Sequence, residues 1–124
     1  MTRRTVYVAG AINAPSAGKY LNNIRKGIQL STKVFLARFA PFCPFIDFHY
    51  NLVMSDEQVG MIKTEDFYDY SIAWLEKADY VLLVPGWENS VGTKKEIERA
   101  NELNIPVFES LDILVRHDER QQVH

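Results

Sequence analysis

The stretch ADYVLLVPGWENSVGTKKEIERA, which spans residues 78–100, carries the pattern that decides the fold. Its apolar run YVLLV (residues 80–84) is the most hydrophobic segment of the chain, and Pro85 and Gly86 stop it. This pattern is typical of a central strand of a parallel sheet, buried on both faces. A polar, glycine-bearing loop follows, and a helical pattern is then predicted over residues 91–103. We therefore expect the strand, loop and helix of an α/β fold.

The same alternation of strand and helix runs through the rest of the chain. Continuous apolar runs predict further strands, and apolar residues at helical spacing predict further helices. The predicted strands are 5–12, a short segment within 39–47, and 106–108, and the predicted helices are 16–38, 64–79 and 111–117. A loop is expected up to about residue 60, and the tail 118–124 is expected to be frayed.

The second predicted strand contains Pro41 and Pro44, which lack the N–H group that a ladder hydrogen bond needs. We therefore expect it at an edge of the sheet. Because helices connect the strands, the order of elements predicts an open, mainly parallel sheet of four or five strands with helices on both faces. Ligands bind such sheets at the carboxyl ends of the strands. If the first strand neighbours the third, the loops at residues 10–13 and 85–93 meet there.

The composition limits the classes of protein to consider. The 124 residues, 47% of them hydrophobic and 24% charged, suit one domain, residues 1–124, and are too few for a two-domain enzyme. With 14 basic and 16 acidic residues the net charge is −2, and no basic run is longer than Arg3-Arg4. We therefore expect no binding to a nucleic acid polymer or to a membrane.

Cysteine and histidine usage points to a cytoplasmic location. The single cysteine, Cys43, cannot form an internal disulfide, and three scattered histidines show no metal-ligand spacing. The apolar segment that ends before Asn13 is too short for a secretory signal or a membrane span. We expect a reduced, metal-free protein in the cytoplasm.

Glu96 is the first candidate for a functional side chain. On a helical wheel with about 100° per residue it falls inside the apolar stripe beside Ala100 and Leu103, whereas Glu98 and Glu102 fall on the opposite side. A carboxylate about one turn into a helix and facing the sheet either complements the helix dipole or points into the ligand crevice as a functional group. The spacing fits both interpretations.

Residues at the start of the same helix form a candidate anion site. Ser90, Gly92 and Thr93 stand where N–H groups lack an internal partner and the dipole is positive, so a phosphate would fit there. Ser90 or Thr93 also suits the capping position, and the two roles are compatible. Gly10, which follows the first strand, either allows a ligand to approach the backbone or serves the turn alone.

Two groups of residues resemble the nucleoside 2-deoxyribosyltransferase family. They are Tyr7-Val8-Ala9-Gly10 in the first strand and the frame S-x-G-x-x-x-E-x-x-x-A, formed by Ser90, Gly92, Glu96 and Ala100. The branch that the chain resembles most is that of the small deoxynucleoside 5′-monophosphate N-glycosidases, and the resemblance implies a flavodoxin-like fold. It covers residues 6–108, although residues 31–60 match only as a helix, a strand and a loop.

The resemblance implies roles for particular residues. Glu96 matches the nucleophile that attacks C1′ of the sugar and forms a covalent glycosyl-enzyme, a role that suits a fixed carboxylate. Tyr7 matches a tyrosine near the sugar and the nucleophile, although a tyrosine in a strand is also a common core residue. Ser90, with the N–H group of Gly92, matches the position that binds a 5′-phosphate. The first ligand loop is matched by Gly10, Ala11, Ile12 and Asn13.

The chain departs from the family pattern at one functional position. An aspartate ahead of the third strand, which handles the leaving base or the sugar hydroxyl, is Ser71 here. Either the chemistry proceeds without that acid or another group, such as Asp47 or Asp66, supplies it. Asp47 is also expected to line the base pocket together with His49, and Trp87 either stacks on a base or covers the sheet edge.

We therefore expect an N-glycosidase or N-(deoxy)ribosyltransferase that cleaves the base–sugar bond of a nucleoside 5′-monophosphate or nucleoside and needs no cofactor. The family often completes its pocket with a neighbouring subunit, so we expect a homodimer or higher homo-oligomer. Tyr50, Phe67 and Tyr68 are candidates for that contact, and the buried helix face would carry Phe67, Tyr70 and Trp74.

Three other functions remain open. The pairs PG at 85–86 and GT at 92–93, with Glu96, form an interrupted version of the P-G-G-x-G-T-x-x-E motif of lonely-guy type phosphoribohydrolases. A sensor or sequestering protein would bind a nucleotide without turnover, which Ser71 in place of the aspartate favours. A flavodoxin-like electron carrier would need a first loop richer in glycine, serine and threonine for the flavin phosphate.

Overall fold

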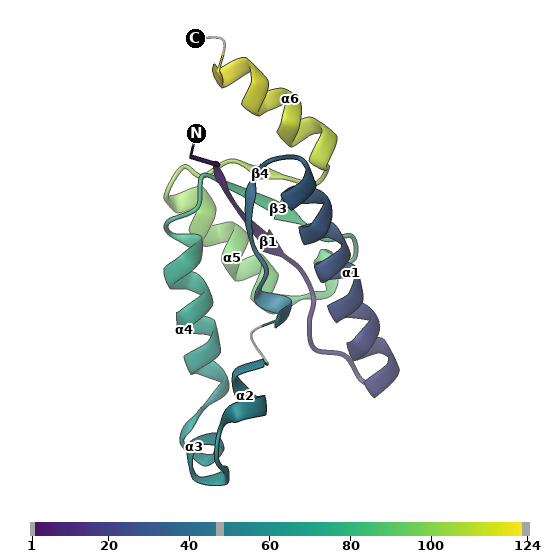
Figure 1. Cartoon of the computed structure of the whole chain (residues 1–124), viewed down its shortest axis with the longest axis vertical. Coiled ribbons are helices and arrows are strands. Elements are labelled where there is room, and N and C mark those ends of the chain that lie inside the picture. The colour runs from purple at the N-terminus through teal and green to yellow at the C-terminus, as the bar shows by residue number, and fades with distance from the viewer. Residues whose placement is uncertain (1, 47–48, 123–124) are drawn as a thin grey trace.

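The computed structural model describes residues 2–46 and 49–122. These residues form a four-stranded sheet with helices around it (Figure 1). The strands are β1 (Thr5–Ala9), β2 (Ala40–Phe42), β3 (Tyr80–Leu83) and β4 (Val107–Phe108). The helices are α1 (Ala17–Leu36), α2 (His49–Val53), α3 (Asp56–Met61), α4 (Thr64–Leu75), α5 (Val91–Glu102) and α6 (Leu111–Gln122), with 3₁₀ turns η1 (Pro44–Ile46) and η2 (Trp87–Asn89). In this part of the chain no helix is long and apolar enough to cross a membrane.

All neighbouring strands run parallel, in the order β2-β1-β3-β4. The first strand pairs with the third, with Val6 opposite Tyr80 and Val8 opposite Leu82. The prediction of an α/β, flavodoxin-like open sheet is therefore confirmed. From β1 the chain moves to one side to form β2 and then to the other side to form β3. The strand order thus reverses between β1 and β3, the place where such sheets bind ligands.

Alternate residues of the central strands face opposite helical layers. Val6 and Val8 of β1 pack into a core with α1 and α6, whereas Tyr7 packs with Leu75 of α4 and Ala100 of α5. Figure 1 shows α1 on one face of the sheet and α4 and α5 on the other. Because successive side chains of a strand point to opposite faces, a strand that is covered on both faces is apolar throughout. This is the physical reason for the run YVLLV in β3.

The second strand lies at the sheet edge, as its prolines predict. After β2 the chain turns through η1, which packs against α1 where the helix carries Gly27. A Cβ atom on Gly27 would lie 2.3 Å from ring atoms of Phe45, so glycine leaves the room that this ring needs. The contact holds η1, including Pro44, near the carboxyl end of the sheet.

The segment that was expected to be a loop up to residue 60 contains the short helices α2 and α3, so this prediction is wrong. A capping box starts α3: Ser55 Oγ accepts a hydrogen bond from the Gln58 N–H at 3.2 Å, and the Gln58 side chain accepts one from the Ser55 N–H at 3.0 Å. Helices this short span too few turns to show apolar periodicity, so only their caps signal them.

The last helix extends to Gln122, so the expected fraying after residue 117 is also wrong. Asp118 is only 7% exposed, and it accepts a hydrogen bond from the Tyr80 hydroxyl at 2.8 Å. The Nε atom of Arg4 lies 3.0 Å from the same carboxylate, and Gln122 Nε2 donates to it at 2.9 Å. These contacts tie the polar tail to β3 and to the start of the chain, which its local sequence does not reveal.

Candidate functional site

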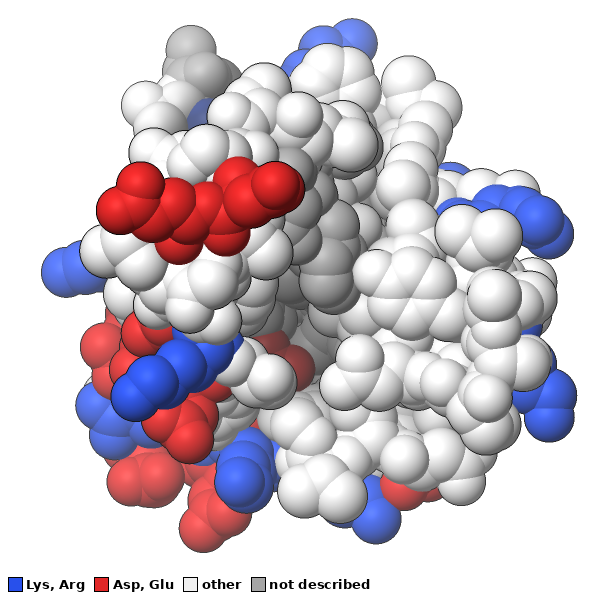
Figure 2. All heavy atoms as spheres, turned by 90° about the horizontal axis from the view of Figure 1, so that it is seen from below, with Lys and Arg blue, Asp and Glu red and all other residues white. Residues whose placement is uncertain are grey.

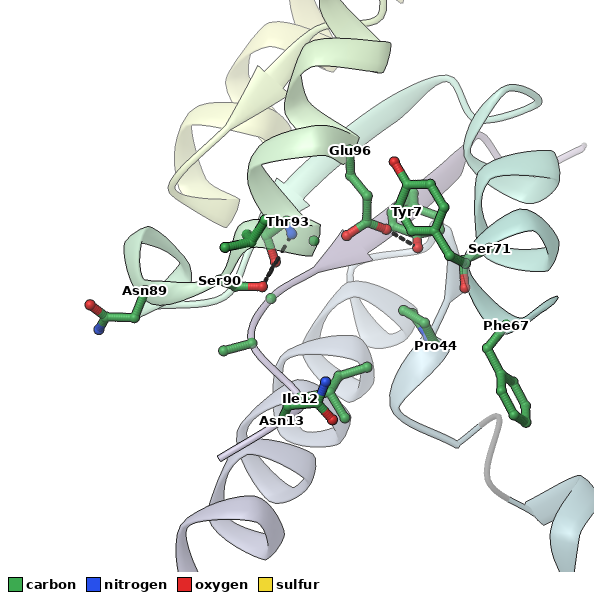
Figure 3. Close-up of a pocket in the computed structure, with 15 residues that line it drawn as sticks. Tyr7, Ile12, Asn13, Pro44, Phe67, Ser71, Asn89, Ser90, Thr93 and Glu96 are labelled. Atoms are coloured by element: carbon green, nitrogen blue, oxygen red, sulfur yellow. Dashed lines mark hydrogen bonds between the residues drawn. The ribbon is translucent and has the colours of Figure 1, made fainter. Parts of the chain in front are cut away.

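A pocket of about 380 Å³ opens at the carboxyl ends of β1 and β3. Figure 2 views the molecule from this end and shows the surface hollowed near its centre. The pocket lies between the loop after β1, helix α4 and the start of α5 (Figure 3). Its described lining consists of Tyr7, Gly10, Ala11, Ile12, Asn13, Pro44, Phe67, Tyr68, Ser71, Asn89, Ser90, Val91, Gly92, Thr93 and Glu96.

The carboxylate of Glu96 lies in this pocket and is only 9% exposed. It belongs to the buried face of α5 with Thr93 and Ala100, whereas Glu98 is exposed, as the helical wheel predicts. The hydroxyl of Tyr7 donates a hydrogen bond to Glu96 Oε2, and Figure 3 shows the two side chains pointing toward each other. A strand residue therefore fixes one oxygen of the carboxylate.

Burial changes the ionisation of this group. Loss of hydration raises the pKa of Glu96 to about 7, and the hydrogen bond from Tyr7 offsets part of this rise. No lysine or arginine is among the described residues that line the pocket. Burial therefore disfavours the carboxylate form in the empty pocket, and a positive charge on a ligand beside Glu96 would stabilise that form.

Stacking contacts also fix the position of the aromatic ring of Tyr7. It stacks on Phe42 with ring centroids 5.5 Å apart, and Phe42 stacks in turn on Trp74 at 5.5 Å. Tyr70 also contacts Phe42, at 6.1 Å. Trp74 and Tyr70, which were predicted for a contact between subunits, thus pack on an aromatic residue of their own chain.

The start of α5 has the geometry of a capped helix end that faces the pocket. Ser90 Oγ accepts a hydrogen bond from the Thr93 N–H at 3.1 Å and another from the Thr93 hydroxyl at 2.9 Å. Ser90 is therefore the N-cap of α5. Val91 and Gly92 also line the pocket, and N–H groups of a first helical turn have no acceptor within the helix. This end of the pocket favours an anionic group.

The loop after β1 contributes to the pocket. A Cβ atom on Gly10 would lie 2.6 Å from Cβ of Val84, so this glycine is needed for the close approach of two segments of the chain. The following residues Ala11, Ile12 and Asn13 line the pocket. The Asn23 side chain of α1 donates to the Ile12 carbonyl at 3.3 Å and thereby fixes the loop on that helix.

Not every predicted site residue is in the described lining. Trp87 is partly buried in the apolar cluster on the α4 and α5 face, so it covers the sheet. Asp66 Oδ2 accepts a hydrogen bond from the Lys63 N–H at 2.8 Å and does not line the pocket. Asp47 lies outside the described residues, and so does the side chain of His49. Ser71 of α4 does line the pocket.

Phe67 and Tyr68, which were candidates for a contact with a neighbouring subunit, line the pocket from α4. Their spacing could have shown this, because residues three and four positions before Ser71 share its helix face. Burial and the nearby Glu96 raise the pKa of Tyr68, so its hydroxyl group stays protonated and can donate a hydrogen bond. Pro44 and Asn89 were missed because no local pattern marks them.

Comparison with known proteins identifies a family. Residues 5–110 match the model of a family described as a domain of unknown function (DUF7768), and the chain belongs to that family. The match includes every described residue that lines the pocket and ends just before α6. No curated protein matches the chain.

Proposed function

We propose that this member of the DUF7768 family is an N-glycosidase or N-(deoxy)ribosyltransferase that cleaves the base–sugar bond of a nucleoside 5′-monophosphate or nucleoside, with Glu96 as the nucleophile. The observation that carries the proposal is the carboxylate of Glu96, 9% exposed and held by the Tyr7 hydroxyl within a pocket at the strand ends. The resemblance to nucleoside 2-deoxyribosyltransferases names the same two residues.

The proposed reaction has two steps. As the bond between C1′ and the base nitrogen breaks, its electron pair leaves with the base, which takes up a proton from water, and positive charge develops on the sugar. One oxygen of Glu96 stabilises this charge and then bonds to C1′. In the second step water or another base attacks C1′, and Glu96 leaves as a carboxylate. The Tyr7 hydroxyl keeps the other oxygen in place throughout.

The 5′-phosphate is assigned to the start of α5. Ser90 supplies a hydroxyl group there, and Gly92 adds a backbone N–H at the positive end of the helix dipole. An acidic residue at position 90 would repel a phosphate. We therefore expect the Ser90→Asp variant to bind a nucleoside better than the matching monophosphate, the reverse of the order expected for the wild type. Calorimetry that finds equal affinity of the wild type for both ligands would exclude the phosphate site.

The decisive experiment is incubation with the 5′-monophosphates of the common nucleosides and deoxynucleosides, and with the nucleosides themselves, followed by chromatography for free base. The Glu96→Gln variant, purified in the same way, is the blank that reveals a contaminating hydrolase. Release of one base by the wild type alone supports the proposal and identifies the substrate. If no member of the panel loses its base, the enzymatic proposal is wrong.

A second function has specific support: binding of a nucleotide without turnover. Glu96 is the one carboxylate among the described residues that line the pocket, and Ser71 occupies the position of the family aspartate. Among the described residues that line the pocket, no acidic side chain other than Glu96 is then available to protonate a leaving base. Calorimetry and the chromatography together separate the two functions. A sensor or sequestering protein would bind a nucleotide, as calorimetry detects, and would release no base.

The proposal includes a homodimer or higher homo-oligomer in the cytoplasm. Large apolar side chains on α2 and α3 are strongly exposed, among them Leu52, Val53 and Met61. Large apolar side chains that are this exposed favour association. Light scattering tests this part of the proposal. A monomeric mass at concentrations where base release persists would exclude a second subunit from the site.

A further inference from the structure

A second pocket, of about 430 Å³, adjoins the pocket of Glu96 at the same end of the sheet. The two pockets share Ala11, Asn13 and Asn89 and lie on either side of the loop after β1. The second one is bordered by α1 and by the segment 84–86 that follows β3. We call it the α1 groove. Together the two hollows cross the junction between β1 and β3, where the strand order reverses.

The side chains of the α1 groove suit an anion. Lys19 and Lys26 line it from α1, and neither forms an ion pair with an acidic residue in the described part of the chain. No aspartate or glutamate is among its described lining residues. The remaining polar side chains are amides, those of Asn13, Asn22, Asn23 and Asn89. Ammonium and amide N–H groups are donors that bind phosphate oxygens.

The helix that forms the groove is itself positively charged. Its sequence AGKYLNNIRKGIQLSTKVFL contains four basic residues and no acidic one, whereas TEDFYDYSIAWL of α4 contains three acidic residues and no basic one. In Figure 2 the right-hand side, the side of α1, carries lysine and arginine side chains and few acidic ones, whereas the left-hand side carries most of the acidic side chains together with several basic ones. The field across this end of the sheet therefore draws negative charge toward the α1 groove.

We propose that the α1 groove binds a second phosphate of the same ligand, so that the preferred ligand is a nucleotide with a pyrophosphate group, such as a nucleoside 5′-diphosphate. This inference rests on the proposed function, which puts the sugar beside Glu96 and the first phosphate at Ser90. From that position the chain of phosphates passes the shared residues Asn89 and Asn13 and reaches Lys19 and Lys26. Figure 3 shows Asn89 pointing away from Glu96, and Asn89 lines both hollows.

Calorimetry with paired ligands tests the inference. The ligands are the 5′-mono- and 5′-diphosphates of deoxyadenosine, deoxyguanosine, deoxycytidine and thymidine. We expect the wild type to bind the diphosphate of its preferred base about tenfold more tightly than the monophosphate. The variant Lys19→Ala/Lys26→Ala should bind both about equally, with the affinity for the monophosphate changed by less than about threefold.

The control is Arg25→Ala/Lys33→Ala, which removes the same charge from the same helix at exposed positions outside the groove. It should keep the preference for the diphosphate. If the wild type binds both ligands equally, or if the control loses the preference as fully as the groove variant does, the α1 groove is not a phosphate site. Base release is measured separately, so a preference for the diphosphate without base release would overturn the proposed enzyme and leave the groove intact.

Discussion

Two buried carboxylates lie on opposite faces of the sheet, and their surroundings differ in one respect. Glu96 is 9% exposed and Asp118 is 7% exposed. Each accepts a hydrogen bond from a tyrosine hydroxyl, Glu96 from Tyr7 of β1 and Asp118 from Tyr80 of β3. Asp118 also has the guanidinium of Arg4 at 3.0 Å, whereas no arginine or lysine is among the described residues that line the pocket of Glu96.

A neighbouring cation distinguishes the structural carboxylate from the one that we propose to be reactive. At Asp118 the charge of Arg4 compensates the buried charge, and the pair ties α6 to the start of the chain. Burial and the Asp118 carboxylate raise the pKa of Tyr80 to about 12, so this tyrosine remains a donor. At Glu96 burial raises the pKa to about 7, and no lysine or arginine is among the described pocket residues that could oppose this rise. A carboxylate that is destabilised in this way and opens onto a pocket is a candidate for chemistry.

The largest expected effect is on base release. Glu96→Gln keeps the shape of the side chain but removes the nucleophile, so we expect base release to fall by at least about a thousandfold. Nucleotide affinity should change by less than about threefold, because the carboxylate acts in the transition state. Asp118→Asn, in contrast, should keep its turnover per folded molecule. Turnover of Glu96→Gln at the rate of the wild type would show that Glu96 is not the nucleophile.

The next effect concerns stability and pH. The pKa of Glu96 is about 7 in the folded chain and 4.5 in the reference state, so the folded protein binds more protons between these values and loses stability as the pH rises. Glu96→Gln removes this loss. The free energy of unfolding of the variant, measured with urea, should therefore rise relative to that of the wild type between pH 5 and pH 8, by at most about 3 kcal/mol. A difference between the two that does not change with pH would contradict the raised pKa.

The third effect is on the stability of the structural carboxylate. Asp118→Asn leaves an acceptor for Tyr80 but removes the charge that Arg4 faces. Because the Arg4 side chain is 43% exposed, water offsets part of the loss, and we expect a decrease of about 1 to 2 kcal/mol in the free energy of unfolding. Urea unfolding at pH 7 measures it. An unchanged free energy of unfolding would show that the pair does not hold α6.

The smallest effect distinguishes the two tyrosines. Tyr7→Phe removes the hydrogen bond that lowers the pKa of Glu96, so the acid limb of the profile of kcat/KM against pH should move to higher pH. At pH 7 this costs less than about tenfold in activity. Tyr80→Phe, the matched variant, should leave the profile in place because Tyr80 contacts Asp118. If both variants shift the profile equally, Tyr7 does not act through Glu96.

Much of the fold and part of the site could be predicted from the sequence. The run YVLLV and the apolar segment before Gly10 predict two strands that are buried on both faces, and they pair as expected. The helical wheel places Glu96 on the buried face of α5, and the Ser90 cap follows from residue type. These features depend on local periodicity and local hydrogen bonds, which neighbouring residues determine.

Other features could not be predicted because they depend on residues far apart in the chain. The ordered tail is held by Asp118 through Tyr80 and Arg4. The α1 groove forms where the loop after β1, helix α1 and the segment 84–86 meet. The sequence was compatible with Trp87 stacking on a base and with Trp87 covering the sheet. Its packing against the apolar cluster supports the second interpretation. The sequence alone determined the alternation of strands and helices and the faces they bury, because these follow from periodicity. Only the tertiary structure decided which buried carboxylate meets a cation, because that depends on where the segments meet in space.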